Sequence, residues 1–487
     1  MNKELRRVST VVLLMFVALF ASSSFIQVIT ADELNADGRN VRTLYDSYSA
    51  ERGPILVDGV AIAESTPVDD QYKYQRSYTQ AELYANITGY FTLNQSNPGI
   101  EGAMNDYLSG TADAQFLDNL TSIVTGQDPK GAAVELTIDP VVQQAAYDAL
   151  GDQRGSVVAI RPDTGEIIAM VSKPSYDPNL LAVHDYDTFA AAYDSLISDA
   201  ASPLVNRAIA GDLYHPGSVF KLIMASAAID SGDFTPDSTF PNPATLTLPG
   251  TSSVISNSSG GACGAGDEAS IATALRLSCN IPMAELGEAL GADTIDDYAS
   301  RFGFGDDIEI PLKVTPSVYP LEYIGDDVAR LMLSSFGQSD DRVTPLQIAM
   351  VSAAIANGGV LMQPNLVESI TAPDLTELKS FQPEVYNTPI SADTATKLTQ
   401  MMVAGVSDGA ASNARINGVD VAGKTGTAEN GSADPYTLWF TGFAPADNPE
   451  VAVAVVVENG GGLGQSGFGN SVAAPIAKKV LEAVLNK

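Results

Sequence analysis

Histidine and cysteine, the usual ligands of zinc, are scarce in this chain of 487 residues, which has only two of each. A structural zinc site with four such ligands would need Cys263, Cys279, His184 and His215 together, and their spacing matches no zinc-binding pattern. A catalytic triad of serine, histidine and aspartate would depend on one of the same two histidines. We therefore expect no metal site, no cofactor and no histidine-based hydrolase.

Basic residues are also few. Lys and Arg total 26 against 59 Asp and Glu, which gives a formal net charge of −33 at pH 7. Such a chain repels polyanions, so nucleic acid is excluded as a partner. Because charged residues make up only 17% of the chain, we interpret the acidic excess as a well-solvated surface. The length suits two or three domains with a large buried core.

Charge is absent from residues 8–29, and this apolar run is long enough for a helix to cross a bilayer. Lys3, Arg6 and Arg7 precede the run, whereas acidic residues follow it. By the positive-inside rule, residues 1–7 form a cytoplasmic tail and the rest of the chain lies outside the cytoplasm. A cleaved signal peptide is the alternative, but its apolar segment is usually about 7–15 residues long. We predict a single-pass protein of the cell membrane anchored by residues 8–29.

The remaining chain divides into a short polar part and a longer part with clear strand and helix patterns. We assign residues 32–150 to a small pedestal or dimerisation domain without chemical motifs, and residues 151–487 to a second domain. Strands at both ends of the second domain, with helices between them, favour an α+β fold in which helices flank an antiparallel sheet. The expected strands cover residues 134–138, 156–160, 166–171, 419–422, 437–444 and 451–457, and the expected helices cover 140–150, 218–230, 271–277, 392–404 and 471–485.

One segment of the second domain, 214–221, has a serine directly after a Pro-Gly pair, at the start of a predicted helix. Ser218 and Lys221 are three positions apart, so they lie on one helical face and the amine can reach the hydroxyl. A lysine buried in apolar surroundings loses basicity and can act as a general base toward the serine. Taken alone, the pattern also fits a capping serine followed by a surface lysine.

Two further motifs strengthen the chemical interpretation. Ser278-x-Asn280 and a Lys-Thr-Gly triplet that begins at Lys424 each occur once, and they follow the Ser-x-x-Lys motif in this order. These three motifs together are the set found in penicillin-binding proteins and class A β-lactamases. The Ser278 hydroxyl can relay a proton between Lys221 and a leaving group, and the Asn280 amide can hold a substrate amide.

The Lys-Thr-Gly segment has the residue types of a carboxylate site. Lys424 supplies a cation, Thr425 and Thr427 supply hydroxyls, and Gly426 lets a substrate backbone approach closely. A peptide with a free C-terminal carboxylate fits this description. In isolation, the same triplet is also typical of an ordinary strand end.

With these motifs, the chain resembles the class B penicillin-binding proteins, and several stretches resemble the actinobacterial penicillin-binding protein A group. The resemblance extends over nearly the whole chain, and the three later segments that carry it are more specific than the two earlier ones. These segments are residues 52–53, 99–101, 174–179, 214–221 and 439–443.

The resemblance implies a penicilloyl-serine-transferase fold and a peptidoglycan D,D-transpeptidase. Such an enzyme cross-links stem peptides ending in D-Ala-D-Ala through an acyl-enzyme on Ser218, and β-lactam antibiotics acylate the same serine. The resemblance also implies an oxyanion hole formed by the backbone N–H groups of Ser218 and Thr427. Class B members lack a glycosyltransferase domain, so a membrane glycan polymerase of the shape, elongation or division family is the implied partner.

Several alternatives stay open at this point. A D,D-carboxypeptidase shares every motif, and a β-lactamase needs a base for hydrolytic water that we cannot assign. A non-catalytic β-lactam sensor or scaffold is a third alternative, although all polar groups of the core are present. Cys263 and Cys279 either form a disulfide, which would stiffen the loop around Ser278, or remain buried thiols.

Overall fold

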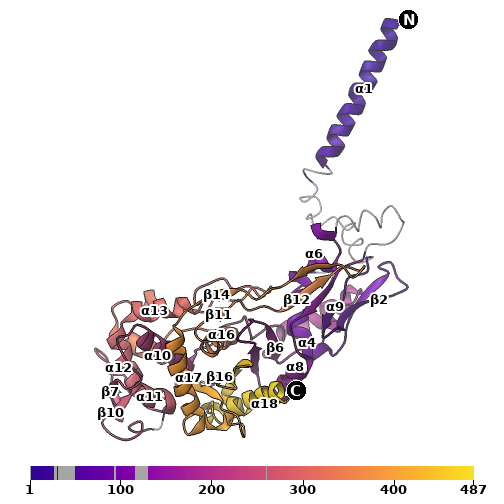
Figure 1. Ribbon diagram of the computed structural model, residues 1–487. Helices are drawn as coiled ribbons and strands as arrows, with labels where there is room; N and C mark the ends of the chain where they lie inside the picture. Colours follow the sequence, from indigo (N-terminus) through magenta and orange to yellow (C-terminus); the bar gives the residue numbers. More distant parts are fainter. Residues whose placement is uncertain are drawn as a thin grey trace.

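The computed structural model describes residues 2–26, 30, 50–92, 95–115, 130–258 and 260–486. Helix α1 (Asn2–Ser24) stands apart from the body of the molecule (Figure 1). Its 23 residues span about 34 Å at 1.5 Å per residue, which is enough to cross the hydrocarbon core of a bilayer. Its side chains are almost all exposed. The helix overlaps the expected anchor at 8–29, of which residues 27–29 lie outside the described part of the chain.

The first part of the body is built on a six-stranded sheet with the order β13-β12-β4-β1-β2-β3. β1 runs parallel to β4 and antiparallel to β2, and β2 forms a hairpin with β3. Short helices cover the sheet. The elements are β1 (Ile55–Val57), β2 (Val60–Pro67), β3 (Tyr74–Tyr78), α4 (Ala81–Thr88), α5 (Gly99–Ala103), α6 (Asn105–Leu108), η2 (Asp113–Gln115) and β4 (Ala133–Leu136).

Two strands of this sheet come from a distant part of the chain. β12 (Val367–Thr371) pairs antiparallel with β4, and β13 (Glu377–Ser380) extends the sheet from β12. In Figure 1 the orange β12 lies beside the violet strands of the first part. No sequence pattern predicted this pairing, which ties the first part of the body to the second.

A cluster of buried charges holds the first part together. Glu101 accepts hydrogen bonds from Nε of Arg52 and Nε of Arg76, both at 2.6 Å, and from the Tyr78 hydroxyl at 3.1 Å. The three charged side chains are almost inaccessible to solvent. Burial raises the pKa of Glu101, but the charges of Arg76 and Arg52 outweigh it and lower that pKa below its ordinary value.

The second part contains a five-stranded antiparallel sheet with the order β15-β16-β17-β5-β6. Successive residues of β17 belong to two different hydrophobic cores, because side chains alternate between the faces of a strand. α16 covers one face, and α8 and α18 cover the other. The elements are α8 (Pro140–Leu150), β5 (Gly155–Ile160), β6 (Ile167–Lys173), α16 (Pro345–Ala356), β15 (Ala422–Ala428), β16 (Thr437–Ala444), β17 (Val451–Val457) and α18 (Ala473–Leu485).

The predicted strands of this sheet are confirmed, with one shift. Strands β16 and β17 have the bounds expected from the sequence, but β15 begins where the predicted strand 419–422 ends and includes the Lys-Thr-Gly triplet. Glycine disfavours strands, which weakens the local strand signal of this segment. Tertiary packing nevertheless requires glycine within this strand, because a Cβ on Gly423 would lie only 2.6 Å from the Phe440 ring.

A mostly helical region between β6 and β15 packs beside the sheet (Figure 1). The expected helices at 271–277 and 392–404 are confirmed, whereas the one expected at 218–230 begins with a 3-10 turn. The region contains η3 (Pro178–Leu180), α9 (Tyr186–Ser198), η4 (Gly217–Val219), α10 (Lys221–Asp230), β7 (Thr239–Pro241), β8 (Thr245–Thr247), β9 (Val254–Ser256), β10 (Glu268–Ser270), α11 (Ile271–Leu277), α12 (Ile281–Leu290), α13 (Ala292–Arg301), α14 (Leu321–Ile324), α15 (Val328–Ser334), β11 (Leu361–Met362), β14 (Val385–Asn387), α17 (Ala392–Ser407) and η5 (Ser412–Ala414).

Candidate active site

Ser218 lies in the 3-10 turn η4, which packs against strand β15. Gly217 has a φ of 53°, in the left-handed region that favours glycine, and its N–H donates to the Gly337 carbonyl at 2.8 Å. A Cβ on Gly337 would lie 2.0 Å from the Gly217 oxygen, so both positions need glycine. The Ser218 residue is 8% exposed, and its hydroxyl makes no hydrogen bond to any described residue. The hydroxyl is therefore available to a reaction partner.

Lys221 begins α10 and is completely buried. Its Nζ donates to the Ser278 carbonyl at 2.9 Å and to Asn280 Oδ1 at 2.8 Å. Burial, and after it the charge of Lys424, lowers the pKa of Lys221 far below its ordinary value. A neutral amine has two N–H donors and one lone pair, and both donors are already used. The lone pair is left to accept a proton, as a general base requires.

Lys424 on β15 lies on the other side of Ser278. Its Nζ donates to the Ser278 hydroxyl at 2.8 Å and to the Thr425 carbonyl at 2.7 Å. Burial lowers the pKa of Lys424 to about 7, so its charge depends on pH in the neutral range. The sequence predicted a proton relay between the Ser278 hydroxyl and Lys221. In the structure, that hydroxyl instead accepts a hydrogen bond from Lys424, and Lys221 donates to the Ser278 backbone carbonyl.

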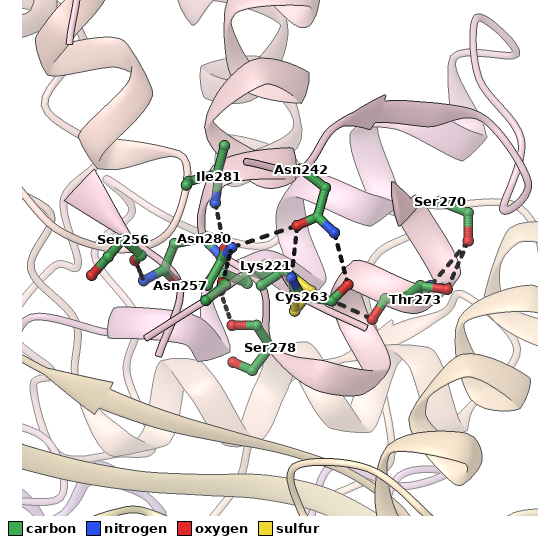
Figure 2. Close-up of a disulfide and its surroundings, with 12 residues drawn as sticks. Lys221, Asn242, Ser256, Asn257, Cys263, Ser270, Thr273, Ser278, Asn280 and Ile281 are labelled. Carbon is green, nitrogen blue, oxygen red and sulfur yellow. Dashed lines mark hydrogen bonds between the residues drawn. A yellow bond between two sulfur atoms is a disulfide. The ribbon is translucent and has the colours of Figure 1, made fainter. Parts of the chain in front are cut away.

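The Ser278–Asn280 turn is held in place by an asparagine that the motif analysis did not identify. Ser278 ends α11 with a φ of 64°. The Asn257 Oδ1 then accepts from the backbone N–H groups of Asn280 and Ile281, at 2.9 and 3.0 Å. The Asn280 amide donates to the Ser256 carbonyl at 3.0 Å (Figure 2). These bonds orient Oδ1 of Asn280 toward Lys221.

A disulfide joins the middle residue of this turn to the neighbouring loop. Cys263 and Cys279 are bonded, with their Cα atoms 5.7 Å apart, which decides between the two alternatives left open by the sequence. Asn242 clamps the loop side, because its amide accepts from Cys263 N and donates to Cys263 O, each at 2.9 Å. Figure 2 shows the disulfide directly beside Lys221 and Ser278.

The two threonines of β15 differ in what their hydroxyls can do. The Thr425 hydroxyl donates to the Ala410 carbonyl at 3.1 Å, so its proton is engaged. The Thr427 hydroxyl accepts from Gly469 N at 3.2 Å, which leaves its proton free to donate. At Gly426, a Cβ would lie 3.1 Å from the Pro216 carbonyl, so it is the turn before Ser218 that approaches this glycine closely.

The order and geometry of these motifs agree with one family of proteins. A family model described as the penicillin binding protein transpeptidase domain matches residues 155–482. The chain belongs to this penicillin-binding transpeptidase family. Ahead of that domain, residues 52–134 of the transpeptidase match a model described as the penicillin binding protein A dimerisation domain.

Known relatives of this penicillin-binding transpeptidase match it along its whole length. Peptidoglycan D,D-transpeptidase PbpA of Mycolicibacterium smegmatis is 42% identical over 497 residues, covering 100% of both chains. The PbpA of Mycobacterium tuberculosis is 40% identical over 495 residues, covering 100% of this chain and 99% of the relative. The ceftriaxone acyl-enzyme complex of penicillin-binding protein A from M. tuberculosis has a TM-score of 0.86 at 39% identity, over 91% of this chain and 100% of that one. The predicted fold and the predicted resemblance are confirmed.

Some residues that shape the transpeptidase site left no signal in the sequence. Asn242, Asn257 and Gly337 each act through one or two hydrogen bonds to a distant segment. Such contacts produce neither a periodic pattern nor a motif, and only the folded chain reveals them. The eight residues proposed from the motifs all lie on η4, α10, β15 or the turn after α11.

Proposed function

We propose that this penicillin-binding transpeptidase is a peptidoglycan D,D-transpeptidase that cross-links stem peptides ending in D-Ala-D-Ala through an acyl-enzyme on Ser218. One observation carries the proposal: two buried lysines from different motifs, Lys221 and Lys424, hydrogen-bond to the same residue, Ser278. That contact joins all three motifs in one site. The full-length similarity to proteins named as peptidoglycan D,D-transpeptidases supports the same activity.

In the first step, the neutral amine of Lys221 takes the proton of the Ser218 hydroxyl. The Ser218 oxygen then forms a bond to the carbonyl carbon of the penultimate D-Ala. The negative charge that develops on the carbonyl oxygen is stabilised by the backbone N–H groups of Ser218 and Thr427. The Thr427 hydroxyl, which has a free proton, binds the terminal carboxylate of the peptide.

In the second step, the bond between that carbonyl carbon and the nitrogen of the terminal D-Ala breaks. The leaving nitrogen takes a proton from the Ser278 hydroxyl, and protonated Lys424 replaces it. Free D-Ala and the acyl-enzyme result, with Lys221 protonated and Lys424 neutral. Attack by the amine of a second stem peptide reverses these transfers, because the amine proton passes through Ser278 to Lys424 and Lys221 returns its proton to Ser218.

The location of the site relative to the membrane belongs to the same proposal. We propose that α1 anchors the enzyme with residues 1–7 in the cytoplasm and everything after the anchor outside. The disulfide between Cys263 and Cys279 supports this topology, since disulfides persist in oxidising compartments. We propose that the pedestal domain predicted at 32–150 ends before α8, because α8 packs on α18 and β6 of the five-stranded sheet, and that the catalytic domain predicted at 151–487 begins with this helix. We also propose a membrane glycan polymerase as the partner.

Labelling with fluorescent penicillin tests the proposed chemistry. We expect the soluble form without α1 to be labelled covalently, with the added mass on the peptide that contains Ser218. Ser218→Ala should abolish the label, whereas Ser226→Ala should keep it, because Ser226 lies on α10 and its hydroxyl bonds, among the described residues, only to the Leu222 carbonyl. Equal labelling of Ser218→Ala and wild type would contradict the proposal.

The fate of the acyl-enzyme separates the alternatives. Release of the penicillin within seconds indicates a β-lactamase, and release of D-Ala from a peptide without any cross-linked product indicates a carboxypeptidase. Labelling without turnover of any D-Ala-D-Ala peptide indicates a sensor. A cross-linked product formed in the presence of an acceptor amine is the expected result.

A further inference from the structure

The segment just before Ser218 is tied to the far end of strand β17. The Tyr214 hydroxyl donates to Glu458 Oε1 at 2.7 Å, and Glu458 directly follows β17. Burial, and after it the Glu458 charge, raises the pKa of Tyr214, so the phenol stays protonated and remains a donor. No motif includes this pair, which is separated by 244 residues in the sequence.

Two arginines fix the Glu458 carboxylate. Arg207 Nε lies 2.9 Å from Oε1, the oxygen that also accepts from Tyr214, and Arg154 Nε lies 2.5 Å from Oε2. The Arg207 side chain is only 3% exposed and also donates to the carbonyls of Ala201 and Ser202. A carboxylate held by two guanidinium groups has little freedom to move, so it is a rigid support for Tyr214.

Tyr214 connects Glu458 to the serine turn, because its ring packs on Trp439 and its backbone leads directly into the turn. Its ring packs edge-on against the fully buried Trp439, with ring centroids 5.8 Å apart. The Trp439 indole N–H donates to the His215 carbonyl at 2.9 Å, and Trp439 is the register partner of Gly426 on β15. The residue after His215, Pro216, lies close to that same Gly426, since its carbonyl oxygen would be 3.1 Å from a Cβ added there. Glu458, Tyr214 and Trp439, here called the brace, thus determine how the serine turn docks on β15.

This docking matters because the proposed oxyanion hole has one N–H on each element, Ser218 on the turn and Thr427 on the strand. A carbonyl oxygen is stabilised in the transition state only if both donors are at hydrogen-bond distance together. We propose that Glu458 is a positioning residue for acylation, which holds Tyr214 and so fixes the Ser218 turn against strand β15. This inference rests on the proposed function for its kinetic consequence, but the brace itself does not depend on catalysis.

The sharpest test is Tyr214→Phe, which removes one hydroxyl and leaves the ring, Glu458 and both arginines in place. We expect the rate constant of acylation by benzylpenicillin to fall about 10- to 100-fold, since misplacement of reacting groups by about 1 Å costs that much. The dissociation constant of the initial complex should hardly change, because the binding groups are untouched. The acid limb of the pH profile should stay in place, because the surroundings of Lys221 are unaltered.

A matched control separates positioning from general loss of stability. Tyr298→Phe removes a partly buried phenol–carboxylate bond of the same kind, from Tyr298 to Asp230 at the far end of α10. Tyr298→Phe should be acylated at the wild-type rate, although its melting temperature should change about as much as that of Tyr214→Phe. Glu458→Gln removes the charge through which Arg154 and Arg207 fix the side chain, so it should slow acylation at least as much as Tyr214→Phe does. The double variant should be no slower than Glu458→Gln alone, because Tyr214 then has no fixed partner left to lose.

A second measurement keeps the brace testable even if wild-type protein were not acylated. Trp439 is the only tryptophan of the chain, so fluorescence excited at wavelengths beyond the tyrosine absorption band reports on the brace alone. We expect Tyr214→Phe and Glu458→Gln, but not Tyr298→Phe, to make the indole more accessible to acrylamide quenching. Wild-type fluorescence and a wild-type acylation rate in folded Tyr214→Phe would overturn the inference. Absent labelling of wild type, with the fluorescence change present, would instead overturn the proposed function.

Discussion

Lys221 and Lys424 meet at Ser278, where Lys221 Nζ donates to the backbone carbonyl at 2.9 Å and Lys424 Nζ donates to the hydroxyl at 2.8 Å. Two ammonium groups so close together and so deeply buried disfavour each other's charge. The pair is therefore suited to hold one proton between them. One lysine can then act as the base for Ser218 while the other supplies a proton through Ser278.

The first prediction concerns the pH dependence of acylation. Lys424 must be protonated to supply the leaving group, and its pKa is about 7, so the second-order rate constant should fall as pH rises through about 7. Lys221 must be neutral, and burial together with the Lys424 charge lowers its pKa far below that of an ordinary lysine, so the rate constant should also fall at the lower pH where Lys221 becomes protonated. Stopped-flow acylation across the pH range measures both limbs.

Lys424→Met serves as the control for this profile. It removes the charge that depresses the pKa of Lys221, so the acid limb of the residual acylation should move to higher pH. The basic limb should disappear. A wild-type rate that stays flat to about pH 10, the ordinary range of lysine, would show that Lys424 does not act as the proton donor.

The second prediction concerns the disulfide. Cys263 and Cys279 are 16 residues apart, and for a loop of about 15 residues the chain-entropy model gives a stabilisation of about 3 kcal/mol. Cys263→Ser/Cys279→Ser should lower the free energy of unfolding by about that amount. It should also slow acylation, because the bridge and Asn257 together orient the Asn280 amide toward Lys221.

Reductant provides the matched comparison for the disulfide. Dithiothreitol should lower the melting temperature and the acylation rate of wild type toward those of the double serine variant, and it should leave that variant unchanged. Circular dichroism melts and penicillin labelling measure the two effects. Equal melting temperatures for oxidised and reduced wild type would rule out a stabilising bridge.

Much of the large sheet could be predicted from the sequence, because its strands have strong local signals. Residues 437–444 and 451–457 are apolar runs separated by a segment with two prolines, and both became strands with the expected bounds. The strand expected at 419–422 instead begins at Ala422 and continues through the Lys-Thr-Gly triplet, because two glycines weaken the local strand signal of this segment. The added strands β12 and β13 could not be predicted, because β12 pairs with β4, which is distant in the chain, and β13 pairs only with β12.

In the candidate site, too, residues in local motifs could be predicted, whereas residues that act on distant segments could not. Its motif residues could be proposed because each motif is a short, recognisable string, and the structure brings Lys221, Ser278 and Lys424 into contact. Their supports could not be proposed. Asn257 and Glu458 act by hydrogen bonds to segments far away in the sequence, for which residue type and spacing leave no trace.

The third prediction concerns the buried charge cluster of the first part. Glu101→Gln leaves the buried guanidinium groups of Arg52 and Arg76 without a counter-charge, which should cost about 3–5 kcal/mol of unfolding free energy. Urea denaturation followed by circular dichroism measures the loss. Glu51→Gln is the matched control, because its ion pair with Lys130 is largely exposed and contributes about 0–1 kcal/mol. Similar losses in both variants would contradict a special role for the buried cluster.

The fourth prediction concerns Asp341, a completely buried residue in the loop that follows Gly337. Neither of its carboxylate oxygens has a hydrogen-bond partner among the described residues. Burial raises the pKa of Asp341 far above its ordinary value, and the nearby Arg342 charge offsets only part of this effect. The folded protein therefore binds this proton more tightly than the unfolded chain does.

The sign of the resulting pH dependence follows from proton linkage. Between the ordinary pKa and the raised one, the folded state holds one proton more, so the free energy of unfolding falls as pH rises through that window. Asp341→Asn cannot titrate and should lose this slope. Urea denaturation at about pH 5 and about pH 8 should show that the free energy of unfolding falls less with rising pH in the variant than in wild type. The stability of the variant relative to wild type should therefore increase as pH rises. Parallel pH dependences in the two proteins would mean that Asp341 is ionised in the folded state, with a partner that compensates its charge.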